Sequence, residues 1–451
     1  MLIVVALAAL SSLALAPGDQ VEPLGNGAMR TAIVGLAVAL LSLLPVGFSL
    51  PTAHRLILRS PSACQGLRQF RRWQTIHTWL WLAVSVAIVI GLDWPTYVRI
   101  NLGLGTLPVA AESLILAPLL LPLTLAWAAY YDVDRAAQQL QNADTSLDTG
   151  HSSISRLQYV MVQARLYFGM SIGPLLFLFL SLDVAHLLRP TWNANELAGW
   201  VIAAMLMLLL ATYPLLLRAL WRSPKLPAGP LRWSLEHLTA RSGLKLGEIL
   251  VWPTDGRVCN AAVAGVTPLC RYVFLTDGLL RSVPAEEVEA AFAHELAHIA
   301  RHHLWWRLLG MCVPIAWWGT LQPWYSHHPI ACLVGSLLIV TLGGIAFGWY
   351  AKLLEYDADL WAVRQLGSVR GGVRAAQARY ARMLETMDPA SSRSRWEWLH
   401  PHTAHRIAFL QRTVNPQSER KFFLRIQGAN AAVVSLLTLA LVVALLTRAS
   451  S

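Results

Sequence analysis

Long apolar runs alternate with short polar connections along most of the chain. About 20 apolar residues are enough for a helix to cross the hydrocarbon core of a bilayer, so runs of this length predict transmembrane helices. The first run is shorter, but no cationic residue precedes it as in a signal peptide, and we interpret it as an uncleaved helix. The predicted helices cover residues 2–16, 31–50, 77–96, 105–130, 166–188 and 198–219, then an apolar stretch that ends near 322, and residues 330–350 and 429–447.

After the sixth run the pattern changes to that of a small soluble domain with helices and short strands. A Pro/Gly-rich linker, Ser223–Pro230, precedes a segment with helical spacing at Leu231–Ser242. Pro284 then begins a further helix. Because no helix breaker follows before Pro314, we expect this helix to continue to about Gly310 and to enter the bilayer. Strands are expected at 249–252, 258–265 and 272–275.

Composition and charge agree with a membrane protein. Hydrophobic residues make up 55% of the chain and charged residues only 14%, against about 25% in soluble domains. The net charge of +11 comes from basic residues in the connections between apolar runs, which argues against a nucleic-acid partner. Five arginines in the connection 51–76 predict that it lies in the cytoplasm, and alternation of the spans then places the soluble domain on the same side.

The motif HELAH occupies residues 294–298 in the helix that begins at Pro284. Residues four apart project from one face of a helix, so His294 and His298 can bind a single metal ion. Neutral imidazoles suit zinc, and the adjacent Glu295 can accept a proton from a water that zinc activates. The motif by itself is weak evidence, because a solvent-exposed helix face carrying His and Glu would show the same pattern.

A zinc site of this kind needs a third protein ligand. The sequence contains no Asp or Glu between His298 and Glu355, which follows the predicted hairpin of two membrane helices directly. We therefore expect Glu355 to be the third ligand. Asp359, one turn later, can accept a hydrogen bond from a ligand histidine and fix its orientation. On a continuous helix His302 and His303 have the wrong angular positions to reach the metal, so we interpret them as side chains of the membrane interface.

The combination of HELAH, two spans and Glu355-Tyr-Asp-Ala-Asp359 resembles the integral-membrane zinc metalloproteases that include the HtpX-type proteases and the CAAX prenyl endopeptidases. Two further segments add to the resemblance. Asn260–Gly265 resembles the family's NAxA strand, and His400-Pro401 with Arg406-Ile407 resembles its HPP…RI stretch. The resemblance implies that a substrate peptide pairs with the strand and that His400 assists at the scissile carbonyl. The implied substrate-binding residues are Asn260, Ala261, Ala262, Val263 and Ala264.

The resemblance also implies the fold class and the reaction. We expect a mainly α, polytopic membrane protein with a cytoplasmic α+β domain of the zincin (gluzincin) type and one zinc ion per chain. Its substrates would be proteins or peptides, in particular membrane proteins or misfolded proteins, cleaved at the bilayer surface. The expected division is a membrane domain 1–220, a catalytic part 221–305, a membrane hairpin 306–350, a second catalytic part 351–426 and a last span 427–451.

Two other functions remain open at this point. A sensor-type antirepressor metalloprotease would also place HExxH between spans on the cytoplasmic side, although the external loops predicted here are short. The second is a transporter or scaffold that carries HELAH by coincidence.

Overall fold

The computed structural model describes residues 27–58, 63–145, 155–165, 168, 194–254, 256, 258–325, 329–368, 372–387, 399–413 and 416–450. The predicted span 2–16 and almost all of 166–188 lie outside these residues. The chain divides into two compact units, Met1–Leu209 and Leu210–Ser451.

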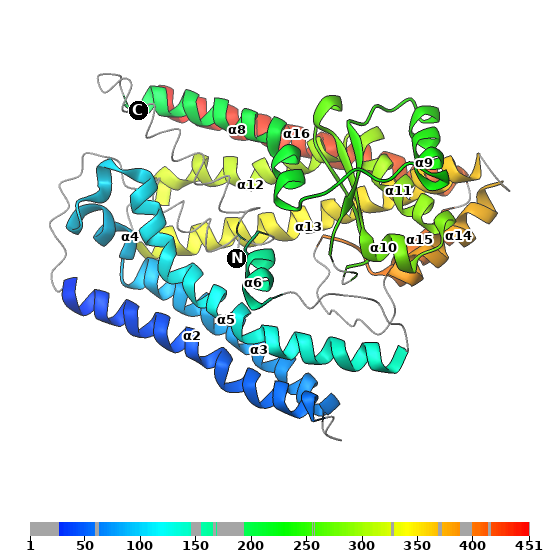
Figure 1. The fold of residues 1–451 in the computed structure, drawn as a ribbon. Helices are drawn as coiled ribbons and strands as arrows, with labels where there is room; N and C mark the ends of the chain where they lie inside the picture. The colour runs from blue at the N-terminus through cyan, green and yellow to red at the C-terminus, as the bar shows by residue number, and fades with distance from the viewer. Residues whose placement is uncertain are drawn as a thin grey trace. The chain divides into compact units, whose positions relative to one another are not determined.

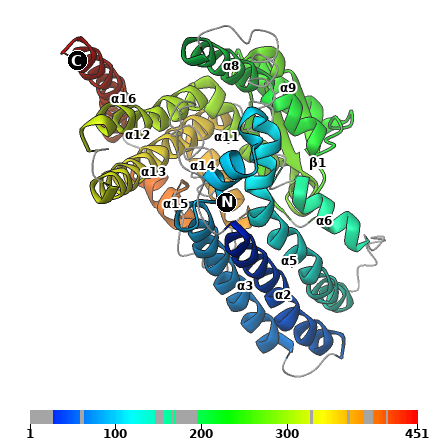
Figure 2. The ribbon, with the colours of Figure 1, turned by 90° about the vertical axis from the view of Figure 1, so that its left-hand side faces the viewer.

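Three helices form the frame of the first unit, and they run side by side (Figures 1 and 2). They are α2 (Gly27–Ile57), α3 (Ala63–Val86) and α5 (Pro108–Thr145). Apolar side chains fill the space between them; Trp81 and Ile115 are almost fully buried. Shorter pieces complete the unit: π-helical turns at Ala87–Gly91 and Tyr97–Asn101, α4 (Trp94–Thr96), a 3-10 turn at Leu104–Thr106 and α6 (Arg156–Ala164).

Among the described residues, four helices are long and apolar enough to cross a membrane, or up to five if one bent pair counts as a single span. Large apolar side chains are widely exposed on these helices, as expected of surfaces that face lipid. They identify the chain as a membrane protein, while the predicted topology stays a prediction. The four helices are Gly27–Ile57, Val109–Ala137, Val334–Gly367 and Pro416–Thr447, and the bent pair is Gln65–Val89 with Trp94–Asn101.

A three-stranded sheet lies in the second unit, in the order β1-β3-β2. The central strand β3 (Tyr272–Thr276) is buried along its whole length. It pairs in parallel with β1 (Glu248–Trp252) and antiparallel with β2 (Ala261–Ala264), which forms an edge. These are the predicted strands, with β2 shorter than expected. Shorter helices complete the described part of this region: α10 (Asp277–Ser282) and α11 (Ala285–Ala300) contact the sheet, α9 (Pro230–Arg241) and α14 (Gly372–Met387) pack on α11, and α15 (Thr403–Arg412) packs on α14.

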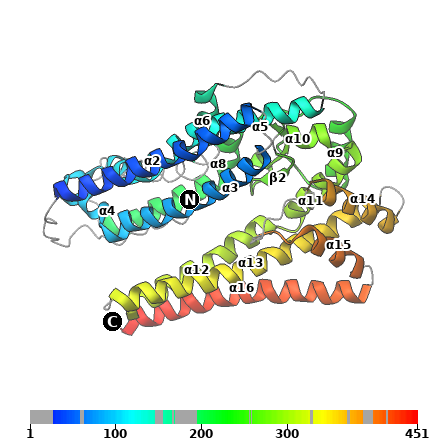
Figure 3. The same ribbon diagram turned by 90° about the horizontal axis from the view of Figure 1, so that it is seen from below.

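Three long helices of the second unit lie side by side (Figure 3): α12 (His303–Tyr325), α13 (Pro329–Gly367) and α16 (Pro416–Ser450). Close packing of α12 on α13 depends on Gly343, where a Cβ atom would lie 2.4 Å from Cβ of Pro314. Helix α13 continues past its apolar part and packs its last turns against α11 and α14. It therefore brings Glu355 and Asp359 to the helix that carries HELAH. Helix α8 (Ala194–Leu220) crosses the boundary between the two units.

The helix that carries HELAH does not continue to Gly310, so that expectation is wrong. Helix α11 ends at Ala300, and His302 takes a left-handed backbone conformation with φ of 55°. The N–H groups of Arg301 and His302 donate to carbonyl groups of the preceding turn and close the helix. Helix α12 then begins at His303. Since neither Gly nor Pro marks this position, the usual sequence signals for a helix end are missing.

Candidate metal centre

Helix α11 carries His294, Glu295 and His298 in its C-terminal half. It begins after Pro284, and Glu286 and Glu287 lie in its first turn, where the helix dipole favours negative charge. Both histidines are buried, with 8% and 6% of their surfaces exposed, whereas Glu295 is half-buried. The two imidazoles therefore face the interior of the domain, and the carboxylate between them lies at its edge.

Three donor groups converge at the distances that a tetrahedral zinc site requires. Nε2 of His294 lies 3.2 Å from Nε2 of His298 and 3.3 Å from Oε2 of Glu355, and Nε2 of His298 lies 3.5 Å from Oε1 of Glu355. Ligand atoms bound about 2.0–2.1 Å from a tetrahedral zinc ion are roughly 3.3–3.4 Å apart. The expected ligand set is thus brought together from α11 and α13 in a geometry that fits zinc. Donor atoms of His294, Glu295 and His298 also lie within 4.8 Å of one another.

The charges around the site differ between its members. Burial lowers the pKa of His298 well below its usual value, which keeps this imidazole neutral as a metal ligand requires. Burial also lowers the pKa of His294, but hydrogen bonds with Asp359 and Glu355 outweigh it and raise the pKa to about 9. For Glu295, burial and the nearby Glu355 raise the pKa of the carboxyl group. A carboxyl group with a raised pKa is suited to accept and return a proton near neutral pH.

A buried network holds the other ring nitrogen of His294. Its Nδ1 lies 3.0 Å from Oδ1 of Asp359 and 2.8 Å from the hydroxyl of Tyr380. The Tyr380 hydroxyl donates to Asp359 at 2.6 Å, and Arg406 donates to both carboxylate oxygens of Asp359. Asp359 therefore occupies the place that we expected beside a ligand histidine. Tyr380 was not identified from the sequence, because nothing in the pattern of α14 distinguishes it from a core tyrosine.

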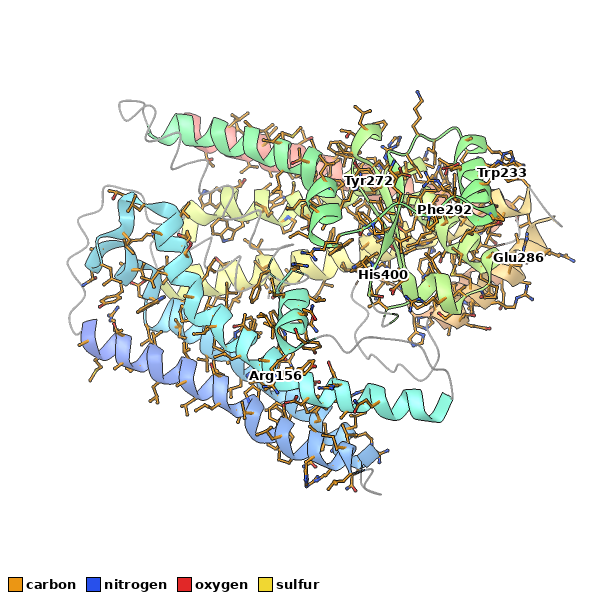
Figure 4. The ribbon with its side chains drawn as sticks, viewed as in Figure 1. Arg156, Trp233, Tyr272, Glu286, Phe292 and His400 are labelled. Atoms are coloured by element: carbon orange, nitrogen blue, oxygen red, sulfur yellow. The ribbon has the colours of Figure 1, made fainter. Side chains whose placement is uncertain are left out.

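Two basic side chains contact Glu355 from other elements. Nδ1 of His400 lies 3.0 Å from Oε2 of Glu355, and the His400 side chain is 62% exposed (Figure 4). Arg307 on α12 pairs with Oε1. The structure thus brings the expected His400 to the rim of the site and adds Arg307, whose role the sequence did not indicate because Arg307 precedes Glu355 by a whole hairpin.

The interpretation of His303 as a membrane-interface side chain is wrong. His303 is 1% exposed, and its Nδ1 lies 3.0 Å from Nδ1 of His298. The cause is the break at His302, which redirects the first residue of α12 toward α11. His302 itself is exposed.

The strand expected to bind substrate lies beside Glu295. The N–H of Val263 on β2 points away from β3 and donates to Oε2 of Glu295 at 2.8 Å. Asn260, just before the strand, is bound through its backbone to the end of β3, at Thr276. The edge Asn260–Ala264 is thus the side of the sheet nearest to the candidate metal ligands.

The fold and the site together define a mainly α membrane protein with a small sheet and a candidate metal-binding cluster of the HExxH type. Residues 225–414 match the sequence model of Peptidase family M48. This match covers less than half of the chain, and it agrees with the family resemblance drawn from the motifs.

Part of the chain is also similar to proteins named as proteases. The chain is 32% identical over 158 residues to a Protease HtpX homolog of Aeropyrum pernix, which covers 31% of this chain and 48% of the relative. It is 40% identical over 162 residues to a Protease HtpX homolog of Herminiimonas arsenicoxydans, which covers 32% and 54%. The chain thus matches about half the length of these relatives. The crystal structure of Ste24p from S. mikatae superposes with a TM-score of 0.48 and 17% identity, over 84% of this chain and 98% of that one.

Proposed function

We propose that this chain is a membrane-embedded, zinc-dependent endopeptidase. The observation that carries the proposal is the convergence of His294, His298 and Glu355 at 3.2–3.5 Å, with Glu295 between them and an edge strand. A solvated helix face with a coincidental HELAH would not bury both imidazoles or bring them a carboxylate from another helix. The match of residues 225–414 to the model of Peptidase family M48 supports the same function.

The residues of the chain divide the chemistry between them. His294, His298 and Glu355 would hold the ion. A bound zinc ion supplies Lewis acidity, which acidifies water and polarises a carbonyl group. Glu295 accepts the proton of the attacking water and returns it to the leaving amine. His400, at the exposed rim, can donate a hydrogen bond to the oxygen that gains negative charge.

The edge strand provides the means to orient a peptide. An extended peptide can add to a sheet edge by main-chain hydrogen bonds, and the edge of β2 that does not pair with β3 faces Glu295. A substrate paired there would bring its own backbone carbonyl groups close to the ligand cluster. Because main-chain bonding does not depend on sequence, it favours broad specificity for unfolded or extended segments.

We further propose that the site works at the cytoplasmic face of the bilayer on membrane-associated or misfolded proteins. Helix α12 begins five residues after His298 and carries Trp305 and Trp306 in its first turn, a pair typical of the membrane interface. Helix α13 joins an apolar span directly to Glu355. Both features support a short distance between the ligand cluster and the lipid.

The test is cleavage of casein and of a membrane-protein substrate by the detergent-purified protein. We expect cleavage that a chelator abolishes and zinc restores, and a Glu295→Gln variant that retains zinc but loses at least about a hundredfold in activity. Zinc loss in this variant would assign Glu295 a structural role instead. Stoichiometric zinc without any cleavage would favour a regulatory or binding function.

A further inference from the structure

Three side chains outside the ligand cluster form a continuous series of polar contacts that begins at Nδ1 of His298. Nδ1 of His298 meets Nδ1 of His303 at 3.0 Å, and Nε2 of His303 lies 3.1 Å from Oδ2 of Asp357. Arg301 then donates to both oxygens of Asp357, at 2.7 and 3.2 Å. His303 and Asp357 are 1% and 7% exposed, so the polar groups in the middle of this series are shielded from water.

The directions of these hydrogen bonds follow from metal ligation. If His298 binds the ion through Nε2, its neutral ring carries the proton on Nδ1 and donates it to Nδ1 of His303. His303 then carries its own proton on Nε2 and donates to the carboxylate of Asp357. Each of these ring nitrogens is thus either a donor or an acceptor, and Arg301 balances the negative charge of Asp357.

The interruption of the helix at His302 makes this series of side-chain contacts possible. On a continuous helix, His303 would be rotated about 140° away from His298, because five residues correspond to roughly 500°. Because His302 takes a left-handed backbone conformation, α11 ends there and α12 begins at His303, whose side chain contacts His298 on α11. A non-glycine residue in that conformation is uncommon and carries a cost, which the buried contacts of its neighbour offset.

We propose that His303, Asp357 and Arg301 form a relay of positioning residues that fixes the ring of His298 for metal binding. The inference rests on the proposed zinc site. The surroundings of the two ligand histidines then differ. His294 contacts the carboxylate of Asp359 directly, whereas the imidazole of His303 lies between His298 and the carboxylate of Asp357. A neutral acceptor polarises the ring of His298 less than a carboxylate does. The site therefore holds the ring in place without adding a second negative charge next to a ligand.

The direct test is zinc affinity, measured by competition with a chromogenic chelator on the full-length protein in detergent. His303→Ala should weaken zinc binding about 10- to 100-fold. His303→Asn, which keeps an acceptor toward Nδ1 of His298, should recover part of that loss. The matched control is His302→Asn, since His302 is exposed and Asn tolerates the left-handed backbone, and it should bind zinc as the wild type does.

A double-mutant cycle separates a relay from a general loss of stability. Asp357→Ala should weaken zinc binding in the wild-type background but add little to His303→Ala, since the contact that transmits its effect is already gone. Additive effects, or wild-type affinity in a folded His303→Ala protein, would overturn the relay. If His303→Ala fails to fold, His303→Leu takes its place in the cycle, because a leucine side chain also cannot accept from His298 or donate to Asp357. Failure of the proposed zinc site is distinguishable, because the wild type itself would then bind no zinc. Zinc binding without cleavage would overturn only the proposed endopeptidase activity and would leave this test of the relay intact.

Discussion

Zinc binding should displace about one proton from the protein at neutral pH. In the metal-free protein the contacts of His294 with Asp359 and Glu355 outweigh the effect of burial and raise its pKa to about 9. A metal ion binds only the neutral imidazole. Protons and zinc therefore compete for Nε2 of His294 throughout the physiological range.

The number of protons released follows from the difference between the pKa of His294 and the pH of the experiment. With a pKa of about 9, His294 is on the order of 99% protonated at pH 7, so zinc binding releases close to one proton. The apparent zinc affinity should rise roughly tenfold per pH unit from pH 6 to 8 and level off above pH 9. The stability of the metal-free protein has the opposite dependence on pH. Because folding raises the pKa of His294 from about 6.5 to about 9, protonated His294 stabilises the folded state fully below pH 6.5, and this contribution is lost as the pH rises through about 9.

Calorimetry in buffers of different ionisation enthalpy measures the number of protons released. The titration is best done in Glu295→Gln, so that the raised pKa of Glu295 contributes nothing. Asp359→Asn removes one of the contacts that raise the pKa and should reduce both the proton release and the slope with pH. Asp132→Asn, which alters an ion pair with Arg156 instead, serves as the control. No proton release at pH 7, together with an affinity that is flat from pH 6 to 8, would refute the reasoning.

Two further variants test the surroundings of the site. Arg406→Met removes the guanidinium that donates to both oxygens of the fully buried Asp359 carboxylate, and it should lower the free energy of unfolding by about 3–5 kcal/mol. Arg364→Met breaks a pair whose arginine is 59% exposed and should change the thermal transition little, so equal shifts in the two variants would contradict this account. Val263→Pro removes the N–H that faces Glu295 without removing a bond to β3, and should lower kcat/KM for peptides roughly tenfold at unchanged zinc affinity. Val263→Ala keeps that N–H, and a peptide assay in which both variants behave alike would rule out pairing at this edge.

Local patterns were enough to predict much of this protein. The spacing of His294 and His298 is a property of one helix, and the absence of carboxylates before Glu355 leaves few choices for a ligand after the hairpin. The short strands and the apolar helices follow from periodicity and turn residues, which act over a few positions. The family motifs added Asn260–Ala264 and His400 to the predicted site, and the roles of these residues stay predictions.

The tertiary structure decided which distant side chains complete the site. Tyr380 and Arg307 contact His294 and Glu355 from helices that are distant in sequence, and Asp357 contacts His303 on another helix. These contacts depend on how the helices pack. The clearest case is His303. A helix extrapolated from local propensity turns this residue away from His298, whereas the left-handed backbone at His302 turns it inward. The sequence by itself determined the metal-binding motif and its third ligand as expectations. Only the fold determined what holds them, because buried polar contacts between separate elements have no periodicity along the chain.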